Sequence, residues 1–172
     1  MESPAMNEEL QTQLKYLRLP GLLSQWDEII EEADQKKPSY TRLLKDVTAR
    51  EYHLKRERSR LLRLKKAGLP QVQVMETYPF DKQPKLNRRQ CLEIYDSKSY
   101  LLKQQHIALI GPTGTGKTGL AISYLVHAIN QGCTGKFVLF ADLIDELYQA
   151  VADHSEKKVI KKYLAYDCLT ID

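Results

Sequence analysis

The sequence lacks the features that mark disulfide-stabilised, zinc-binding and membrane-spanning proteins. Its 172 residues include only three cysteines, an odd number without any C-x-x-C pair, which excludes a disulfide framework and a cysteine zinc site. The four histidines lie far apart without the spacing of metal ligands, so we expect surface or packed histidines. The longest uncharged apolar run, residues 107–110, is far too short to cross a bilayer.

The amino-terminal residues also lack the form of a targeting signal. Residues 1–7 do not combine a basic start with an apolar run, as a signal peptide does. The composition, with 42% hydrophobic and 28% charged residues, is that of a soluble globular protein with one domain or two small ones. We therefore expect a cytoplasmic protein that has no contact with a membrane.

A glycine-rich motif is the clearest functional signal in the chain. Residues 111–118 match the pattern G-x-x-x-x-G-K-[ST] in full and lie between a short apolar run and an amphipathic segment. Glycines let the backbone curl around an anion, and N–H groups at a helix N-terminus point at it. The predicted nucleotide-binding residues are Gly111, Pro112, Thr113, Gly114, Thr115, Gly116, Lys117 and Thr118. The alternative is an ordinary glycine-rich turn.

Two side chains of this motif have predicted roles in phosphate and metal binding. Lys117 supplies a mobile positive charge for the β- and γ-phosphates, and Thr118 supplies a hydroxyl for Mg²⁺. Asp172 follows an apolar run that reads as a buried strand, so it can supply a second oxygen ligand for Mg²⁺. The alternative for Asp172 is an aspartate without a special role.

The segments around the motif alternate between strand and helix patterns. We expect strands at 106–110, 136–140 and 167–172, and helices at 120–130 and 159–163 with another that Asp142 caps. The helix after the motif has an apolar stripe formed by Leu120, Tyr124, Leu125, Ala128 and Ile129. This alternation predicts a parallel, right-handed α/β sheet with flanking helices.

The amino-terminal part is predicted to be helical. A first helix ends near Leu19 because Pro20 follows, and a second has its apolar stripe over 22–33 and closes at 36–38. A third helix begins after Ser39 and stops at Gly68. Three prolines between residues 69 and 86 indicate an extended linker, and Asn87 has capping-box spacing to Gln90 in a further helix. The predicted domains are therefore 1–72, a linker at 73–86, and 87–172.

The third helix carries a one-sided excess of positive charge. Between residues 50 and 66, eight basic residues face two acidic ones, an excess too large for pairing along the helix. This pattern predicts sequence-tolerant, salt-sensitive contact with the phosphates of double-stranded DNA, and the alternative is a solvated helix face. The candidate DNA-binding residues are Arg50, Lys55, Arg56, Arg58, Arg60, Arg63, Lys65 and Lys66.

Several motifs together resemble one protein family. They are the run 17–22 (Leu-Arg-Leu-Pro-Gly-Leu), the basic helix, residues 78–81 (Tyr-Pro-Phe-Asp), residues 86–90 (Leu-Asn-Arg-Arg-Gln) and residues 111–118. From about residue 6 to residue 172 the chain resembles the IstB-like ATPases, which are transposition helpers of insertion sequences. These proteins belong to the AAA+ group of P-loop NTPases and are related to DnaA and DnaC.

The resemblance implies ATP and Mg²⁺ as cofactors and assigns roles to three residues. Lys117 and Thr118 correspond to the Walker A motif and Asp172 to the Walker B aspartate. The amino-terminal helical domain would engage DNA, a cognate transposase would be the partner, and intact relatives would form homo-oligomers. The expected fold is an all-helical domain followed by an incomplete AAA+ parallel sheet.

The family pattern continues beyond the last residue of this sequence. In the family an acidic residue that orients water follows the Walker B aspartate, and sensor residues and an arginine finger come later, so we expect a fragment without hydrolysis. In the family's sheet order both neighbours of strand 106–110 would follow Asp172, so that strand would have no partner. The alternatives are a helicase loader of the DnaC type, or a non-catalytic helical module in which residues 1–68 bind DNA or another partner.

Overall fold

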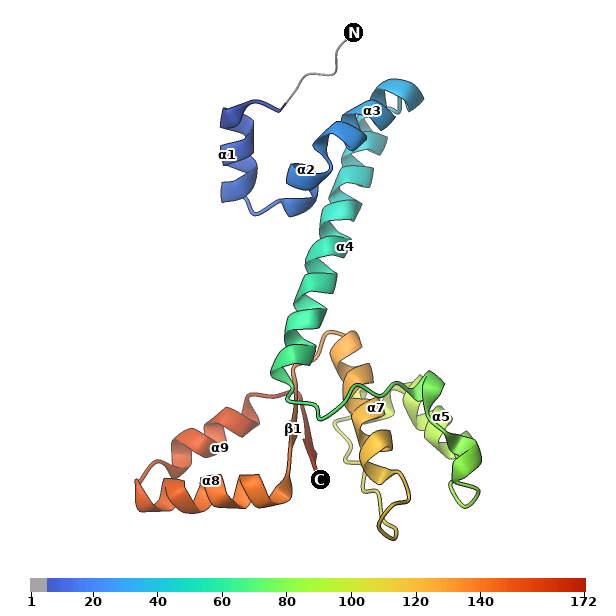
Figure 1. Cartoon of the computed structure of the whole chain (residues 1–172), viewed down its shortest axis with the longest axis vertical. Helices are drawn as coiled ribbons and strands as arrows, with labels where there is room; N and C mark the ends of the chain where they lie inside the picture. The colour runs from blue at the N-terminus through green and yellow to red at the C-terminus, as the bar shows by residue number, and fades with distance from the viewer. Residues whose placement is uncertain (1–5) are drawn as a thin grey trace. The chain divides into compact units, whose positions relative to one another are not determined.

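The computed structural model describes residues 6–172, which divide into two compact units between Ser59 and Arg60 (Figure 1). The described part of the first unit is residues 6–59, and the second unit is Arg60–Asp172. The prediction that residues 1–7 carry no signal sequence falls mostly on residues 1–5, which lie outside the described part. Among residues 6–172, none of the helices has the length and apolar character that a membrane span requires.

The first unit is entirely helical in its described residues, as predicted. It contains α1 (Glu8–Tyr16), α2 (Pro20–Ser24), α3 (Trp26–Lys36) and most of α4 (Tyr40–Lys66). The second predicted helix is wrong as a single helix, because the backbone at Gln25 (φ −121°, ψ 19°) leaves helical values and separates α2 from α3. Its predicted close at 36–38 is confirmed, since α3 ends at Lys36. The predicted start and stop of α4 are confirmed: Ser39 Oγ accepts a hydrogen bond from Arg42 N (3.4 Å), and Gly68 has φ +69°.

The proline and the glycine at the start of α2 have separate structural reasons. Pro20 begins α2, where its missing N–H costs no helical hydrogen bond. Glu51 is only 6% exposed, and its Oε1 accepts a hydrogen bond from Leu22 N at 2.7 Å. A Cβ atom at Gly21 would lie 2.7 Å from Leu54 Cδ1 and 3.0 Å from Glu51 Oε1. A glycine at this position therefore lets α2 lie close to α4.

The second unit has the predicted α/β character. Its elements after α4 are η1 (Met75–Thr77), η2 (Phe80–Lys82), α5 (Arg88–Ser97), α6 (Ser99–Leu102), α7 (Lys117–Asn130), β1 (Gly135–Val138), α8 (Phe140–Ala152), α9 (Glu156–Leu164) and β2 (Cys168–Ile171). Strands β1 and β2 pair in parallel, with Gly135 opposite Cys168 and Val138 opposite Ile171. The sheet and its flanking helices fit a partial P-loop NTPase fold, which confirms the predicted fold class.

Helix α7 is the centre of the second unit and is buried along most of its length, at Leu120 and residues 122–129. One hydrophobic cluster joins it to η1, α5 and α6 through Met75, Tyr78, Cys91, Tyr100, Leu120, Tyr124 and Ala128. A second cluster joins it to β1 and the end of α4 through Ala67, Ile122, Leu125, Val126, Ile129 and Phe137. All five residues of the predicted apolar stripe are buried. A helix that is buried along most of its length holds its N-terminus in a fixed place.

The strand predicted over 106–110 does not form, although its neighbouring motif is in place. Within residues 6–172 the sheet has two strands, and neither pairs with this segment. Ile107 and Leu109 are half-buried against the first cluster, whereas Ile110 is 96% exposed. A strand needs a partner to satisfy its N–H and C=O groups, so this segment forms no β-ladder.

Three further predictions are corrected by the packing of the second unit. Residues 73–86 do not form an extended linker, because η1 and η2 fold there and Met75 and Tyr78 enter the core. The strand predicted over 136–140 ends at Val138, and α8 begins at Phe140. Asp142 lies within the first turn of α8, where a negative charge is favourable, while Leu139 takes the N-cap position. The predicted Asn87 cap is confirmed, since its Oδ1 accepts from Gln90 N at 3.1 Å.

Candidate functional site

The glycine-rich loop uses two glycines in a backbone conformation that other residues rarely adopt. Gly114 has φ +79° and Gly116 has φ +78°, both in the left-handed region. At Gly116 a Cβ atom would also lie 2.5 Å from the Tyr78 hydroxyl oxygen, so space and backbone both require glycine there. These two residues let the loop turn into α7, as the sequence pattern predicts.

Two side chains of the loop fold back onto one carbonyl group. Thr115 Oγ1 donates a hydrogen bond to Pro112 O at 2.8 Å, and Lys117 Nζ donates to the same oxygen at 2.7 Å. The ammonium group of Lys117 therefore lies over the loop rather than in open solvent. A phosphate oxygen forms a stronger, charge-assisted hydrogen bond than a neutral carbonyl, so an anion bound in the loop would attract this group.

The N-terminus of α7 provides a positive electrostatic end next to the loop. The helix has 14 residues and begins at Lys117, directly after Gly116. Its first turn contains no acidic side chain, so nothing in that turn neutralises the partial positive charge of the free N–H groups. The loop and this helix end together have the chemistry of a phosphate site.

The sheet brings together the predicted metal-binding pair, whose two residues are 54 positions apart in the sequence. The Thr118 hydroxyl lies 3.0 Å from each carboxylate oxygen of Asp172, and it donates a hydrogen bond to this group. The backbone of Asp172 is held on both sides, because its N–H donates to Val138 O (3.1 Å) and its C=O accepts from Phe140 N (2.7 Å). The sequence predicted both residues, and the β1–β2 pairing explains their proximity.

The oxygen atoms of this pair fit Mg²⁺ and would not make a complete metal cage. A hydroxyl and a carboxylate are hard ligands, and Mg²⁺ commonly keeps several waters while it binds one or two protein groups and substrate phosphates. Among residues 6–172 there is no cluster of three or more His, Cys, Asp and Glu side chains that could hold a metal. The arrangement therefore suits Mg²⁺ that arrives with a phosphate ligand.

Tyr78 lies at this site although no sequence motif assigns it a role there. Its hydroxyl donates a hydrogen bond to Gly116 O at 3.2 Å, and its side chain is buried. Burial raises the pKa of Tyr78 above its ordinary value, so the hydroxyl keeps its proton. The only sequence signal was its place in residues 78–81, which carried the family resemblance. No spacing rule connects this tyrosine to a loop 38 residues away.

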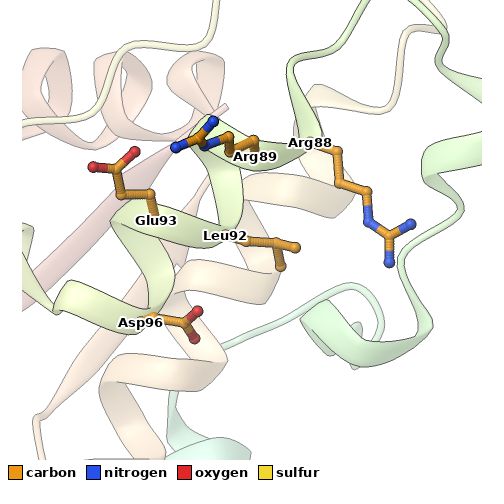
Figure 2. A pocket seen from close by; sticks show the side chains of 5 residues that line it. All are labelled: Arg88, Arg89, Leu92, Glu93 and Asp96. Carbon is orange, nitrogen blue, oxygen red and sulfur yellow. The ribbon is translucent and has the colours of Figure 1, made fainter.

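Two surface hollows lie on the second unit. One is lined by Met75, Glu76, Tyr78, Phe80, Asp81, Arg88, Leu92, Tyr95 and Asp96, and it shares Tyr78 with the glycine-rich loop. The other is lined by Arg88, Arg89, Leu92, Glu93 and Asp96. All five side chains come from α5, and Figure 2 shows Arg88 directed away from Arg89 and Glu93. One helix alone does not enclose a ligand, so this second hollow is helix surface.

The structure divides the predicted DNA-binding residues into exposed and protein-bound groups. Arg50 donates to Glu32 Oε2 at 2.8 Å and lies 4.0 Å from Glu28 Oε1. Arg60 Nη1 donates to Asn130 Oδ1 at 3.2 Å, and Arg63 is half-buried with contacts of its own. The exposed residues are Lys55, Arg56, Arg58, Lys65 and Lys66. These five can reach a phosphate backbone without breaking an ion pair that the structure shows.

The buried histidine and the cysteines have structural surroundings. His127 is packed in the core, where the Tyr100 hydroxyl lies 2.9 Å from its Nδ1 and the Tyr95 ring stacks on it. Burial, together with the positive charge of Lys98, lowers the pKa of His127, so the ring is neutral at pH 7. The three cysteines are free thiols, as predicted, and burial raises the pKa of Cys168 to about 11.

Comparison with known proteins gives consistent matches over nearly the whole chain. The family model described as IstB-like ATP binding protein matches residues 12–172. A protein of Bacteroides fragilis (strain YCH46) described as an insertion sequence IS21-like ATP-binding protein is 30% identical over 164 residues, which cover 95% of this chain and 82% of that protein. A protein of Geobacillus stearothermophilus described as an insertion sequence IS5376 ATP-binding protein is 29% identical over 167 residues, 97% of this chain and 66% of that protein.

A third relative has a similar extent. The protein of Bacillus thuringiensis subsp. berliner described as an insertion sequence IS232 ATP-binding protein is 26% identical over 165 residues, which cover 96% of this chain and 66% of that protein. The chain thus spans 66% of the length of each of these last two relatives.

Proposed function

Because this chain belongs to the family of IstB-like ATP-binding proteins of insertion sequences, we propose that residues 111–118 bind ATP with Mg²⁺ and that the protein assists transposition of DNA. The observation that carries the proposal is the contact between Thr118 and Asp172, at 3.0 Å, beside the glycine-rich loop. A parallel strand pair delivers a carboxylate to the N-terminus of α7, where a phosphate-bound metal would need it.

Each part of the site has a separate task in ATP binding. The loop backbone and the free N–H groups of α7 would hold the phosphate oxygens, and Lys117 would leave Pro112 O to contact the β- and γ-phosphates. Thr118 and Asp172 would hold Mg²⁺, which neutralises phosphate charge when it is bound. The Asp172 carboxylate, which accepts the hydrogen bond from Thr118 in the free protein, would be the carboxylate ligand of the metal.

The proposed transposition role rests on contact with double-stranded DNA. The five exposed basic residues of α4 supply positive charge without base-reading geometry, which suits contact with phosphates of any sequence. A cognate transposase, and further copies of the protein, are the partners that the family resemblance suggests. The exposed residues Lys55, Arg56, Arg58, Lys65 and Lys66 are the candidates for the DNA contact.

The ATP site can be tested by calorimetry with one loss-of-charge variant and one matched control. Lys117→Ala removes a charge-assisted hydrogen bond, typically worth about 1.5–3 kcal/mol, so ATP affinity should fall about ten- to a hundredfold. Lys103→Ala removes an exposed lysine outside the loop and should leave the affinity unchanged. EDTA should weaken binding to the wild type. Equal ATP affinity in the wild type and Lys117→Ala would refute the proposed site.

A further inference from the structure

We propose that Tyr78 is a positioning residue that holds the glycine-rich loop in its phosphate-binding conformation and couples the loop to residues 75–82. The juxtaposition that supports this is the buried Tyr78 hydroxyl against the Gly116 carbonyl, 38 residues apart in sequence. The proposal rests on the proposed ATP site, since it concerns how that site is kept ready for its ligand.

The Gly116 carbonyl is the point at which the loop becomes a helix. This oxygen accepts one hydrogen bond from Leu120 N at 3.0 Å, the first turn of α7, and a second from the Tyr78 hydroxyl at 3.2 Å. A carbonyl oxygen has two lone pairs, so both bonds can form together. The peptide group of Gly116 is therefore held from the helix side and from the side of residues 75–82.

The Tyr78 ring adds a steric constraint to this hydrogen bond. A Cβ atom at Gly116 would lie 2.5 Å from the Tyr78 hydroxyl oxygen, and one at Gly119 would lie 3.6 Å from Tyr78 Cε2. The ring thus covers the two glycines on either side of Lys117 and Thr118. Movement of the Gly116 peptide toward the ring is blocked, and movement away from it breaks the hydrogen bond.

The position of Tyr78 is itself set by the segment around it. Tyr78 and Met75 belong to the hydrophobic cluster on α7, and the Phe80 ring packs edge-on against Tyr78 with centroids 4.8 Å apart. The Arg88 guanidinium lies 5.4 Å from the Phe80 centroid, which links the segment to α5. The Tyr78 side chain therefore links the loop conformation to the folding of residues 75–82.

Removal of the hydroxyl should lower the fraction of molecules whose loop is ready to bind. Affinity falls in proportion to the fraction of binding-competent molecules. Loss of a neutral hydrogen bond typically changes an equilibrium about two- to tenfold, so Tyr78→Phe should weaken ATP binding by about that factor. Coupling is reciprocal, so bound nucleotide should slow amide hydrogen exchange in residues 75–82 of the wild type.

Tyr124→Phe is the matched control, because its hydroxyl makes an equivalent bond away from the loop. The Tyr124 hydroxyl donates to Cys91 O at 2.9 Å in the same hydrophobic cluster. The full chain is studied as wild type, Tyr78→Phe, Tyr124→Phe and Lys117→Ala. ATP·Mg²⁺ affinity is measured by calorimetry, and amide exchange of residues 75–82 and 111–121 is measured by mass spectrometry with and without nucleotide.

The expected result is selective. Tyr78→Phe should weaken ATP binding, speed exchange in residues 111–121 of the free protein, and remove the nucleotide-dependent protection of residues 75–82. Tyr124→Phe should lower stability while keeping both the affinity and that protection. Unchanged affinity and unchanged exchange in Tyr78→Phe, or equal effects of the two variants, would overturn the role of Tyr78.

The same set of variants separates this role from the ATP site itself. If neither the wild type nor Lys117→Ala binds ATP, the proposed ATP site is wrong. Exchange of residues 111–121 in the free protein then still decides the role of Tyr78. Faster exchange in Tyr78→Phe than in Tyr124→Phe supports loop positioning, and equal exchange refutes it.

Discussion

Two glycine-to-alanine substitutions in the second unit should differ in their effect on its stability: one should destabilise the unit and the other should not. At Gly135 in β1, a Cβ atom would lie 2.7 Å from Leu125 Cδ1 and 3.0 Å from Ile129 Cγ1, and both of these side chains are completely buried. At Gly119 in the first turn of α7, the nearest atom would be Tyr78 Cε2 at 3.6 Å, an ordinary contact. The first site is therefore overfilled by one methyl group, and the second has room for it.

The expected magnitudes follow from these distances. Non-bonded carbon atoms prefer separations of about 3.5–4.0 Å, so Leu125 must move by roughly 1 Å to accept a methyl group at Gly135. Overpacking of a close-packed interior typically costs about 1–3 kcal/mol. Gly119→Ala replaces a helical glycine by the best helix former, a gain of about 0.8–1 kcal/mol in a helix interior and less at a helix end.

Urea unfolding of both variants and the wild type tests this reasoning. The sole tryptophan, Trp26, lies in the first unit, so its fluorescence reports that unit. The second unit is better followed by amide hydrogen exchange of peptides from α7 and β1 across the titration. Gly135→Ala should lower the urea midpoint, and Gly119→Ala should leave it unchanged or raise it.

The cause of the destabilisation by Gly135→Ala can be identified by repeating this substitution in a protein that also carries Leu125→Ala. Leu125→Ala removes the Cδ1 atom that obstructs a methyl group at Gly135, although it creates a cavity of its own. Gly135→Ala should therefore cost less in the Leu125→Ala background than in the wild type, a coupling that a double-mutant cycle measures. If the cost were the same in both backgrounds, or if both glycine variants shifted the midpoint alike, the steric explanation would fail.

Three further predictions concern pH, thiol reactivity and DNA. Hydrogen bonds from the Thr134 N–H and hydroxyl lower the pKa of Asp167 in the folded protein. Their stabilisation is present above the unfolded-chain pKa of about 3.9 and is lost as pH falls through the lower folded-state pKa. Asp167→Asn should therefore reduce the loss of stability at acid pH measured by urea titration, and an unchanged loss would contradict this. With its pKa raised to about 11 by burial, the Cys168 thiol should react with iodoacetamide far more slowly at pH 8 in the folded protein than in urea, whereas equal rates would place it in solvent. Reversing the charge of four exposed basic residues should abolish duplex binding measured by fluorescence anisotropy; the changes are Lys55→Glu, Arg56→Glu, Arg58→Glu and Lys65→Glu. The affinity of the wild type for duplex should also fall steeply as salt rises, and salt-independent binding would exclude phosphate contacts.

The sequence by itself determined the local features of this protein. Positions 114 and 116 have φ values that only glycine adopts readily, so the glycine pattern in the sequence predicts the conformation of the loop. The apolar stripe predicted helix α7, and the serine before α4 and the glycine after it predicted where that helix begins and ends. These signals act within a few residues, which is the range over which hydrogen bonding and side-chain periodicity shape the backbone.

Only the tertiary structure decided which of these features meet and which remain without a partner. Residues 106–110 have the composition of a strand, yet no neighbouring strand satisfies their backbone groups within residues 6–172. The pairing of β1 with β2 brings Asp172 to Thr118, and the packing of η1 brings Tyr78 to Gly116. Glu32 neutralises Arg50, which looked like part of a basic surface. Such contacts join residues far apart in sequence, and no local pattern records them because they depend on how the elements pack.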